Sequence, residues 1–403
     1  MKIAFLFNHD QVHQVAHSLP IALALAEAGT GAEIVLAVTS DRLRAEVVRY
    51  AGPAISRGAM TLVQLGLRLR TSRALARFSE GVVPATKLLV YRDNLEFFGS
   101  LDVLVVAEKT SLVLKKRYGL ERLKIVHTRH GAGDRAIGFD PASAGFDHVL
   151  VSGAKIRNRL VADAGVDPAR ISIVGYPKFD LVPGRGAINA TIDDDRPVVL
   201  YNPHVSPHLS SWFRMGREVL DWFVEHDEYQ LIFAPHVMLF ERPFVVTIDR
   251  MRIDRCGRIG ERYLRAPNIH IDLGSRASTT MAYTNRADIY LGDVSSQVYE
   301  FLLRPRPCIF LDAHRTGWMG DANYRHWTAG RVVGDVPGMA AALDSAGSDH
   351  AARYRPVQER LFADSFDLDD VPSCERAAAA VARVAGVPFA QPADSPAPRV
   401  VNA

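Results

Sequence analysis

Polar residues stand directly after short apolar runs at several points along the chain, and histidines recur among them. These residues are His9, His13, Arg129, His130, Lys178, His204, His236, Asp293, Ser295 and Ser296, and Gly131 and Pro203 lie among them. If the apolar runs are strands of parallel sheets, the polar residues lie at the carboxyl ends, where open α/β sheets bind ligands. A single histidine after a strand is more often an ordinary loop residue. Several histidines that converge on one cleft are what a catalytic site requires, and histidine suits general-base chemistry near neutral pH.

The segment Asp293-Val-Ser-Ser296 precedes a helical pattern at 297–303. Two hydroxyls and free backbone N–H groups at a helix N-terminus favour a bound phosphate. Aspartate and serine are equally ordinary N-cap residues. By itself, the segment therefore predicts a phosphate site and simple helix capping about equally well.

Several familiar cofactor and catalytic motifs are absent. Gly131-Ala-Gly-Asp-Arg-Ala136 fits the loose GxGxxA pattern, but it does not follow the first strand, and no acidic residue ends a convincing next strand. We therefore reject a nicotinamide site and expect a close backbone turn beside His130. The sequence lacks GxxxxGK[ST] and GxSxG, which disfavours a P-loop ATPase and an α/β-hydrolase.

The three cysteines, Cys256, Cys308 and Cys374, are far apart and form no CxxC pair. This spacing favours neither a zinc site nor a disulfide framework. No carboxylate cluster demands a metal, so we expect metal independence and no cofactor other than a nucleotide-activated substrate.

Alternating strands and helices must position these residues. We expect strands at 2–7, 32–38, 101–107, 124–128, 148–152, 171–174, 197–201, 230–234, 268–272, 289–292 and 307–311. Helical patterns lie at 17–28, 154–164, 214–226, 278–285, 297–303 and 339–345. This alternation predicts an α/β fold with doubly wound parallel sheets.

A chain of 403 residues is too long for a single core, so two domains are expected. We predict an N-terminal Rossmann-like domain at 1–180, a linker at 181–196 and a C-terminal Rossmann-like domain at 197–372. A C-terminal helix at 373–386 and a disordered tail at 387–403, rich in proline and alanine, complete the expected organisation.

The net charge of +3 is too small to indicate a nucleic-acid-binding protein, but basic residues are unevenly distributed. Between Arg42 and Arg77 there are eight arginines and one acidic residue, Glu46. Such a stretch either binds an anionic membrane or a polyanionic acceptor, or is a solvated helical face. No stretch reaches the roughly 18 apolar residues of a membrane helix. We expect a cytoplasmic protein, peripheral at the inner face of the cell membrane if the basic stretch binds lipid.

Taken in order, several segments resemble the CDP-glycerol glycerophosphotransferase family, the teichoic-acid primases and polymerases with a GT-B fold. The matching segments are His130-Gly131, Val174-Gly-Tyr-Pro-Lys-Phe-Asp180, Leu200-Tyr-Asn-Pro203, Pro235-His236, Ala287-Asp-Ile-Tyr-Leu-Gly-Asp-Val-Ser-Ser296, Glu300-Phe301 and Arg306-Pro-Cys-Ile-Phe310. The likeness spans roughly residues 125–312. Val237 replaces an expected proline, His204 stands where threonine is usual, and Asp293-Val294 replaces Asp-Tyr. These departures leave the identity of the donor open.

The resemblance implies a GT-B fold with parallel sheets facing a central cleft, the N-terminal domain on the acceptor side and the C-terminal domain on the donor side. It implies transfer of a polyol phosphate from a CDP-linked donor to a hydroxyl of a cell-surface glycan or lipid-linked acceptor. His130 would be the base and His236 would stabilise the diphosphate. The implied donor-binding residues are Gly131, Lys178, Pro203, Asp293, Ser295, Ser296 and Glu300. Candidate phosphate contacts are Arg129 and His204, and the candidate acceptor-side residues are His9 and His13.

Three other functions stay open on the sequence alone. A GT-B glycosyltransferase would use a nucleotide sugar and release a nucleoside diphosphate. An enzyme similar to UDP-N-acetylglucosamine 2-epimerase would convert its nucleotide sugar without an acceptor. A non-catalytic nucleotide-sugar-binding protein would bind the donor without turnover.

Overall fold

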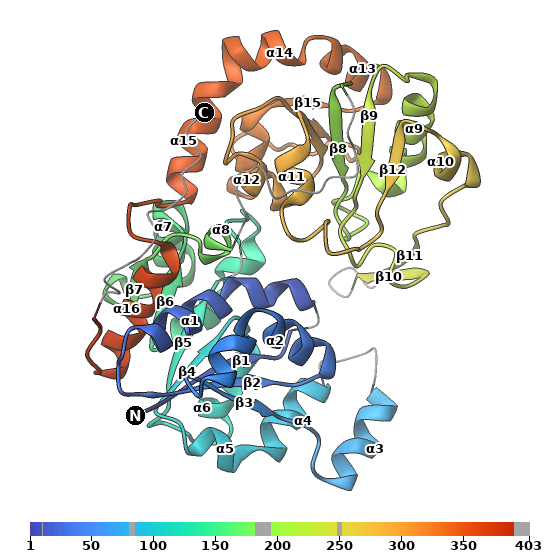
Figure 1. Cartoon of the computed structure of the whole chain (residues 1–403). Helices are drawn as coiled ribbons and strands as arrows, with labels where there is room; N and C mark the ends of the chain where they lie inside the picture. The colour runs from blue at the N-terminus through green and yellow to red at the C-terminus, as the bar shows by residue number, and fades with distance from the viewer. Residues whose placement is uncertain (10, 80–84, 130, 182–194, 248–251, 391–403) are drawn as a thin grey trace. The chain divides into compact units, whose positions relative to one another are not determined.

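Two parallel sheets, each in its own unit, form the framework of the protein (Figure 1). The structure, a computed structural model, describes residues 1–9, 11–79, 85–129, 131–181, 195–247 and 252–390. Unit 1 comprises Met1–Gly131, Phe139–Val182 and Ser365–Ala403, and unit 2 comprises Ala132–Gly138 and Pro183–Asp364. Residues 182–194 of the expected linker and 391–403 of the expected tail lie outside the described residues.

The sheet of unit 1 has seven strands in the order β3-β2-β1-β4-β5-β6-β7. Its strands are β1 (Lys2–Phe7), β2 (Glu33–Val38), β3 (Thr61–Gln64), β4 (Val103–Val106), β5 (Lys124–Thr128), β6 (His148–Val151) and β7 (Ile171–Ile173). Every neighbouring pair is parallel, as the alternation of strands and helices predicts. The direction of strand order reverses between β1 and β4, and such a reversal marks the ligand-binding position of an open α/β sheet.

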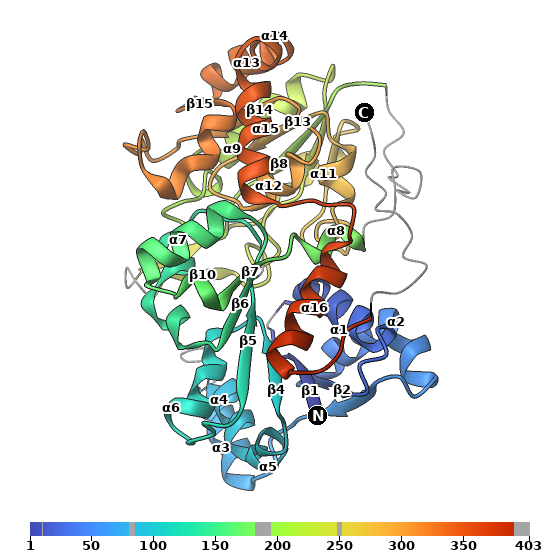
Figure 2. The same cartoon turned by 90° about the vertical axis from the view of Figure 1, so that its left-hand side faces the viewer.

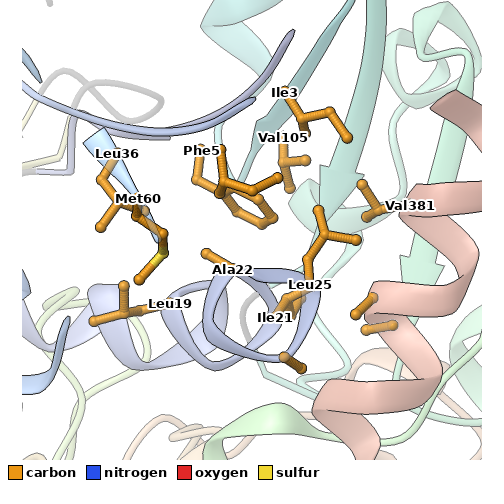
Figure 3. Close-up of a cluster of buried hydrophobic side chains, with 14 of the residues drawn as sticks. Ile3, Phe5, Leu19, Ile21, Ala22, Leu25, Leu36, Met60, Val105 and Val381 are labelled. Carbon is orange, nitrogen blue, oxygen red and sulfur yellow. The ribbon is translucent and has the colours of Figure 1, made fainter. Parts of the chain in front are cut away.

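Helices cover both faces of this sheet because its strands are apolar on both faces. Successive side chains of a strand point to opposite faces, so Ile3 and Phe5 join one core cluster while Ala4 and Leu6 join another. The first cluster packs against α1 (Leu19–Glu27), α2 (Asp41–Ser56) and α16 (Ser373–Ala385). Figure 3 shows Leu25 of α1 and Val381 of α16 in this cluster with Ile3 and Val105. The second cluster includes residues of α4 (Ala85–Asp93), α5 (Leu95–Gly99), α6 (Val113–Lys116) and α7 (Ala154–Ala164).

The segment Val174–Asp180, which carries part of the family resemblance, holds the C-terminal helix in place. The Asp180 carboxylate accepts a hydrogen bond of 2.7 Å from the Cys374 N–H, and Ser373 Oγ accepts one of 3.0 Å from the Tyr176 N–H. Gly175 has a φ of +79°, and a side chain there would collide with Ser373. Residues from the two ends of unit 1 therefore pack together, and α16 lies beside α1 (Figure 2).

The sheet of unit 2 has six strands in the order β12-β9-β8-β13-β14-β15. Its strands are β8 (Val198–Asn202), β9 (Gln230–Phe233), β12 (Ile269–Ile271), β13 (Ile289–Gly292), β14 (Cys308–Leu311) and β15 (Arg331–Val333). All neighbouring pairs are parallel, and the order reverses between β8 and β13. Both units therefore have the Rossmann strand order. A separate antiparallel pair joins β10 (Phe244–Thr247) to β11 (Arg252–Arg255).

The helices of unit 2 lie between these strands and, from α13 onward, after the last of them. They are α9 (Trp212–Glu225), α10 (Glu261–Arg265), α11 (Ala282–Arg286), α12 (Gln297–Phe301), α13 (Val336–Asp344), α14 (Ala346–Asp349) and α15 (Arg355–Ser365), the last residue of which belongs to unit 1. A run of 3-10 helix, η8, covers Ala322–Ala329. The helix predicted at 278–285 begins later, at Ala282, because Met281 adopts a left-handed conformation with a φ of 66°.

The arginine-rich stretch spans α2, β3 and α3 (Arg70–Ser79). Its exposed arginines are Arg42, Arg44, Arg49, Arg57, Arg68, Arg70 and Arg73. Leu69 and Leu75 are also exposed, at 50% and 52%. In the described part of the chain, no helix combines the length and the apolarity needed to cross a membrane. Binding of this stretch to a membrane stays a prediction.

Candidate functional site

The switch point of unit 2 is organised by Asp293, which follows β13. One carboxylate oxygen accepts the His204 N–H at 2.9 Å, and the other accepts the Ser211 N–H at 2.7 Å and the Ser211 hydroxyl at 2.9 Å. Burial raises the pKa of Asp293 to about 6, although these hydrogen bonds favour the charged form. The carboxylate thus fixes the loop after β8 against the loop after β13.

The main-chain carbonyl of Asp293 contacts η8. It accepts the Trp327 indole N–H at 2.8 Å and faces His326 Nε2 at 3.2 Å. The other ring nitrogen of His326 lies 3.1 Å from the buried Asp134 carboxylate. His326 and Trp327 are not among the residues predicted from the sequence, because η8 does not directly follow a predicted strand.

The glycine-rich segment after β5 belongs to unit 2 from Ala132 onward. Gly131 has a φ of +86°, and a side chain at Gly133 would lie 3.1 Å from Ser296 Cβ. The Asp134 carboxylate also accepts the Tyr299 hydroxyl at 2.5 Å. The glycines therefore permit a turn and a close approach, and the approach brings Asp134 against α12 and η8.

His204 and His236 present matching nitrogen atoms at this site. His204 Nδ1 accepts the Ser206 N–H at 2.9 Å, and His236 Nδ1 accepts the Met238 N–H at 3.3 Å. These bonds assign the ring hydrogen to Nε2 in both residues. Burial lowers the pKa of His204 well below its usual value, and burial with the Arg135 charge lowers that of His236 to about 4. Both rings are therefore neutral near pH 7, and each offers one donor.

Arg135 adds a cation to the two imidazole donors. Its Nη1 lies 3.2 Å from His204 Nε2, and the rings of His204 and His236 are 6.0 Å apart. The Ser206 contact places the hydrogen on Nε2, so Arg135 and His204 are two donors 3.2 Å apart that do not bond to each other. An anion with several oxygen acceptors, such as a diphosphate, would accept from all three groups.

The remaining predicted donor-side residues of unit 2 are Pro203, Ser295, Ser296 and Glu300. Pro203 contributes its carbonyl, which accepts the His236 N–H at 3.0 Å. Ser295 Oγ accepts the Gln297 N–H at 3.4 Å, a capping contact, whereas Ser296 is exposed. Glu300 is buried on α12. A phosphate at the two serines and a donor contact of Glu300 stay predictions.

Unit 1 has a second polar cluster at its own switch point, between β1 and β4. Lys87 Nζ lies 3.0 and 3.1 Å from the two carboxylate oxygens of Glu108, and His9 Nδ1 lies 3.8 Å from one of them. Within the described part of the chain, neither ring nitrogen of His9 has a hydrogen bond, and neither has Asn8 Oδ1. A cavity of about 60 Å³ adjoins Asn8 and Lys87. His9 is among the residues predicted from the sequence and Glu108 is not, although Glu108 also follows a predicted strand.

The other predicted residues of unit 1 lie on other elements of the chain. His13 lies in a 3-10 helix, η1 (Val12–His17), and Lys178 is buried on α8 (Pro177–Asp180). The Arg129 guanidinium lies 4.6 Å from the centre of the Phe139 ring, and burial with the nearby Arg159 charge lowers the pKa of Arg129 to about 10. His130, the predicted base, lies outside the described residues.

In the described ranges, no set of three or more histidine, cysteine, aspartate or glutamate side chains is placed to hold a metal ion. Metal independence stays a prediction.

Comparison with known proteins defines the fold class. No protein-family model and no curated protein sequence matches the chain. Among solved structures, the wall teichoic acid polymerase TagF is similar over 96% of this chain and 88% of its own, with 14% identity and a TM-score of 0.58. The UDP complex of MnaA from S. aureus is similar over 98% and 99%, with 13% identity and a TM-score of 0.60. A UDP-GlcNAc 2-epimerase from Neisseria meningitidis is similar over 95% and 99%, with 10% identity and a TM-score of 0.57.

At these identities the likeness establishes the fold and no more. The protein has an α/β fold of the GT-B class, with two Rossmann-like domains, as the sequence predicts.

Proposed function

We propose that the protein is a transferase that binds a CDP-linked polyol at the β8/β13 switch point of unit 2. It transfers the polyol phosphate to a hydroxyl of a glycan or lipid-linked acceptor. The observation that carries this proposal is the convergence of Arg135, His204 and His236: Arg135 Nη1 lies 3.2 Å from His204 Nε2, and the two imidazole rings are 6.0 Å apart. Backbone contacts fix both histidines as Nε2–H donors, so the site is preorganised for an anion.

The proposed reaction forms a bond between the acceptor oxygen and the distal phosphorus of the donor. The bond from that phosphorus to the bridging oxygen breaks, and CMP leaves with the bonding electrons. Charge then accumulates on the CMP phosphate, where Arg135 and the two imidazole N–H groups would stabilise it. His130 is the proposed acceptor of the hydroxyl proton.

A second candidate is the conversion of a UDP-linked sugar by an epimerase. The chain spans 99% of the length of MnaA and of the Neisseria UDP-GlcNAc 2-epimerase, against 88% for the TagF structure. The same three donors would bind the diphosphate of either substrate. The nucleotide and the product therefore decide between the two candidates.

The test begins with nucleotide binding by calorimetry, using CDP, UDP and CMP. We expect CDP to bind and Arg135→Ala or His204→Gln to weaken it by about 10- to 100-fold, because each removes a charge-assisted or buried hydrogen bond. Arg265→Ala is the matched control, since Arg265 is a largely exposed arginine on α10 of the same unit. Equal affinity in Arg135→Ala and the wild type would rule out the proposed site.

The second stage measures products. Release of CMP from CDP-glycerol or CDP-ribitol with a glycan acceptor supports the transferase, and His130→Ala should abolish it. Conversion of UDP-N-acetylglucosamine without an acceptor supports the epimerase, and release of a nucleoside diphosphate from a nucleotide sugar supports a glycosyltransferase. Tight binding without any turnover would indicate a nucleotide-sugar-binding protein.

We also propose that the exposed arginines of α2 and α3 bring the protein to an anionic membrane surface that carries the acceptor. Co-sedimentation with anionic vesicles, but not with neutral ones, is the expected result. A double Arg70→Glu, Arg73→Glu variant should stay in the supernatant. Equal sedimentation of the wild type with both vesicle types would contradict an electrostatic contact.

A further inference from the structure

A large cavity lies in unit 2, one strand beyond the Asp293 switch point. It adjoins the carboxyl ends of β14 and β15 and has a volume of about 610 Å³. That volume is within the range of small-molecule sites, and carboxyl ends of parallel strands are where such ligands bind. The residues that matter for its chemistry are Asp312, Arg315, Trp318, Trp327, Arg331 and Tyr354.

Aromatic rings form much of the cavity wall. Trp318 and Trp327 stand edge to face with their centres 5.9 Å apart, and Tyr354 also lines the cavity. The Trp327 N–H is already bonded to the Asp293 carbonyl, so this residue offers only ring carbon to a ligand. Aromatic faces of this kind pack against the C–H groups of a sugar ring, while its hydroxyls bond to polar groups around them.

Some polar groups of the cavity already form hydrogen bonds within the protein, and one does not. Arg331 bonds to Ser345 Oγ at 3.1 Å, and both oxygens of Asp312 accept the Thr316 N–H at 2.9 and 2.8 Å. The Arg315 guanidinium is exposed and has no hydrogen bond or ion pair to any residue that the structure describes. Arg315 is therefore the group available to bind an anion.

The backbone of Arg315 is also unusual. Its φ is +53°, and among the described residues only Met281 is another non-glycine with positive φ. The left-handed conformation costs an L-residue roughly 1–2 kcal/mol. Such a cost persists where the side chain is needed, since glycine at the same position would avoid it.

We propose that this cavity binds a saccharide ring that carries an anionic group, with the ring against Trp318 and the anion on Arg315. Identification of this saccharide as part of the acceptor rests on the proposed function; the binding itself does not. Trp327 lies between the cavity and Asp293, so a ligand here would be held next to the donor site.

The test is a titration followed by tryptophan fluorescence, in the full chain, with glucose 6-phosphate and glucuronate as probes. We expect saturable binding of at least one of the two probes. Glucose lacks the anionic group and inorganic phosphate lacks the sugar ring, so each should bind at least about tenfold more weakly. Trp318→Phe should reduce the change in fluorescence that accompanies probe binding, whereas Trp222→Phe, on α9, should not.

Arg315→Gly separates binding from folding. We expect it to raise Tm, because glycine relieves the left-handed strain, and to weaken probe binding by about tenfold or more. Arg265→Ala should bind the probes as the wild type does. His204→Gln should lose affinity for CDP and keep affinity for the probes, which distinguishes this site from the proposed nucleotide site.

Three outcomes would overturn the proposal. These are no saturable binding of either anionic sugar up to about 10 mM, unchanged affinity in Arg315→Gly, and competitive displacement of the probe by CMP. The last result would place the probe in the nucleotide site.

Discussion

Asp134 and His326 lie 192 residues apart in the sequence, and a contact of 3.1 Å joins the carboxylate to the ring Nδ1. The same oxygen accepts the Tyr299 hydroxyl at 2.5 Å and the His326 main-chain N–H at 3.1 Å. Both side chains are buried. This carboxylate thus holds the glycine-rich segment against α12 and η8, and Arg135 is the next residue along the segment.

Asp134→Ala should therefore affect both stability and binding. It removes three hydrogen bonds to one buried carboxylate and leaves His326 and Tyr299 without that partner, so we expect a loss of about 2–4 kcal/mol in the free energy of unfolding. CDP affinity should fall as well, because Arg135 loses its support. Urea denaturation and calorimetry measure the two effects.

Glu359→Ala, an exposed carboxylate on α15, should change stability by less than about 0.5 kcal/mol. An Asp134→Ala protein as stable as this control would contradict the role of the contact.

Gly133 and Gly347 make a matched pair for the close approach to Ser296. Alanine at Gly133 would lie 3.1 Å from Ser296 Cβ, whereas alanine at Gly347 would meet nothing within 4 Å. We expect Gly133→Ala to cost about 1 kcal/mol through overpacking and to lower CDP affinity. Gly347→Ala, in α14, should be neutral or stabilise by up to about 1 kcal/mol, since alanine is the better helix former. Thermal unfolding of both variants tests this, and equal Tm values would remove the steric argument.

The strands predicted from apolar runs match the two sheets closely because most are buried on both faces. Residues 2–7 and 124–128, for example, are strands over the predicted lengths. The missed strands β3 and β15 are short edge strands, with partly exposed residues that give no continuous apolar run. Edge strands need less apolar surface, so this signal is weakest for them.

The candidate site was only partly predictable for a related reason. His204, His236 and Asp293 follow predicted strands, so the carboxyl-end rule selects them from local sequence. Arg135 and Asp134 sit in a segment that sequence patterns treat as a turn, and their partners are distant in the chain. Their association with unit 2 depends on tertiary packing, which the local periodicity of apolar residues does not reveal.

Acidification should destabilise the protein through the two site histidines. Burial lowers the pKa of His236 to about 4, and that of His204 lies well below its usual value of 6.5. Between pH 4 and 6.5 the unfolded state binds protons that the folded state does not, so stability falls as pH falls through this window. Asp293, whose pKa is raised to about 6, acts in the opposite direction because its folded form keeps the proton.

Two histidines outweigh one carboxyl group, so we expect a net fall in the free energy of unfolding from neutral pH to about pH 4.5. Urea denaturation at several pH values in this range measures the slope of the free energy of unfolding against pH. His236→Gln should give a shallower slope than the wild type, while His226→Gln, a partly buried histidine at the end of α9, should not. Parallel slopes for wild type and His236→Gln would mean that His236 titrates as in an unfolded chain.

Chelation tests the predicted metal independence. After dialysis against EDTA, CMP release should keep the rate of untreated protein, and added Mg²⁺ or Mn²⁺ should not raise it. The thermal unfolding midpoint should also be unchanged by EDTA, which tests for a structural ion independently of turnover. Loss of activity that a divalent cation restores would show that the prediction is wrong.

His9 and Glu108 lead to a prediction about the acceptor side of the proposed reaction. Burial tends to raise the pKa of Glu108, but the His9 ring 3.8 Å away and the Lys87 charge outweigh it, so the pKa is lowered. The carboxylate can then orient His9, whose ring nitrogens have no hydrogen bonds among the described residues. We expect His9→Gln and Glu108→Gln to lower kcat/KM for the acceptor by about tenfold or more, with CDP affinity unchanged.

Glu33→Gln, at the start of β2 and 51% exposed, is the matched control and should leave both quantities unchanged. If the two site variants weaken CDP binding instead, the cluster belongs to the donor side; if they change neither quantity, His9 and Glu108 serve only the fold of unit 1.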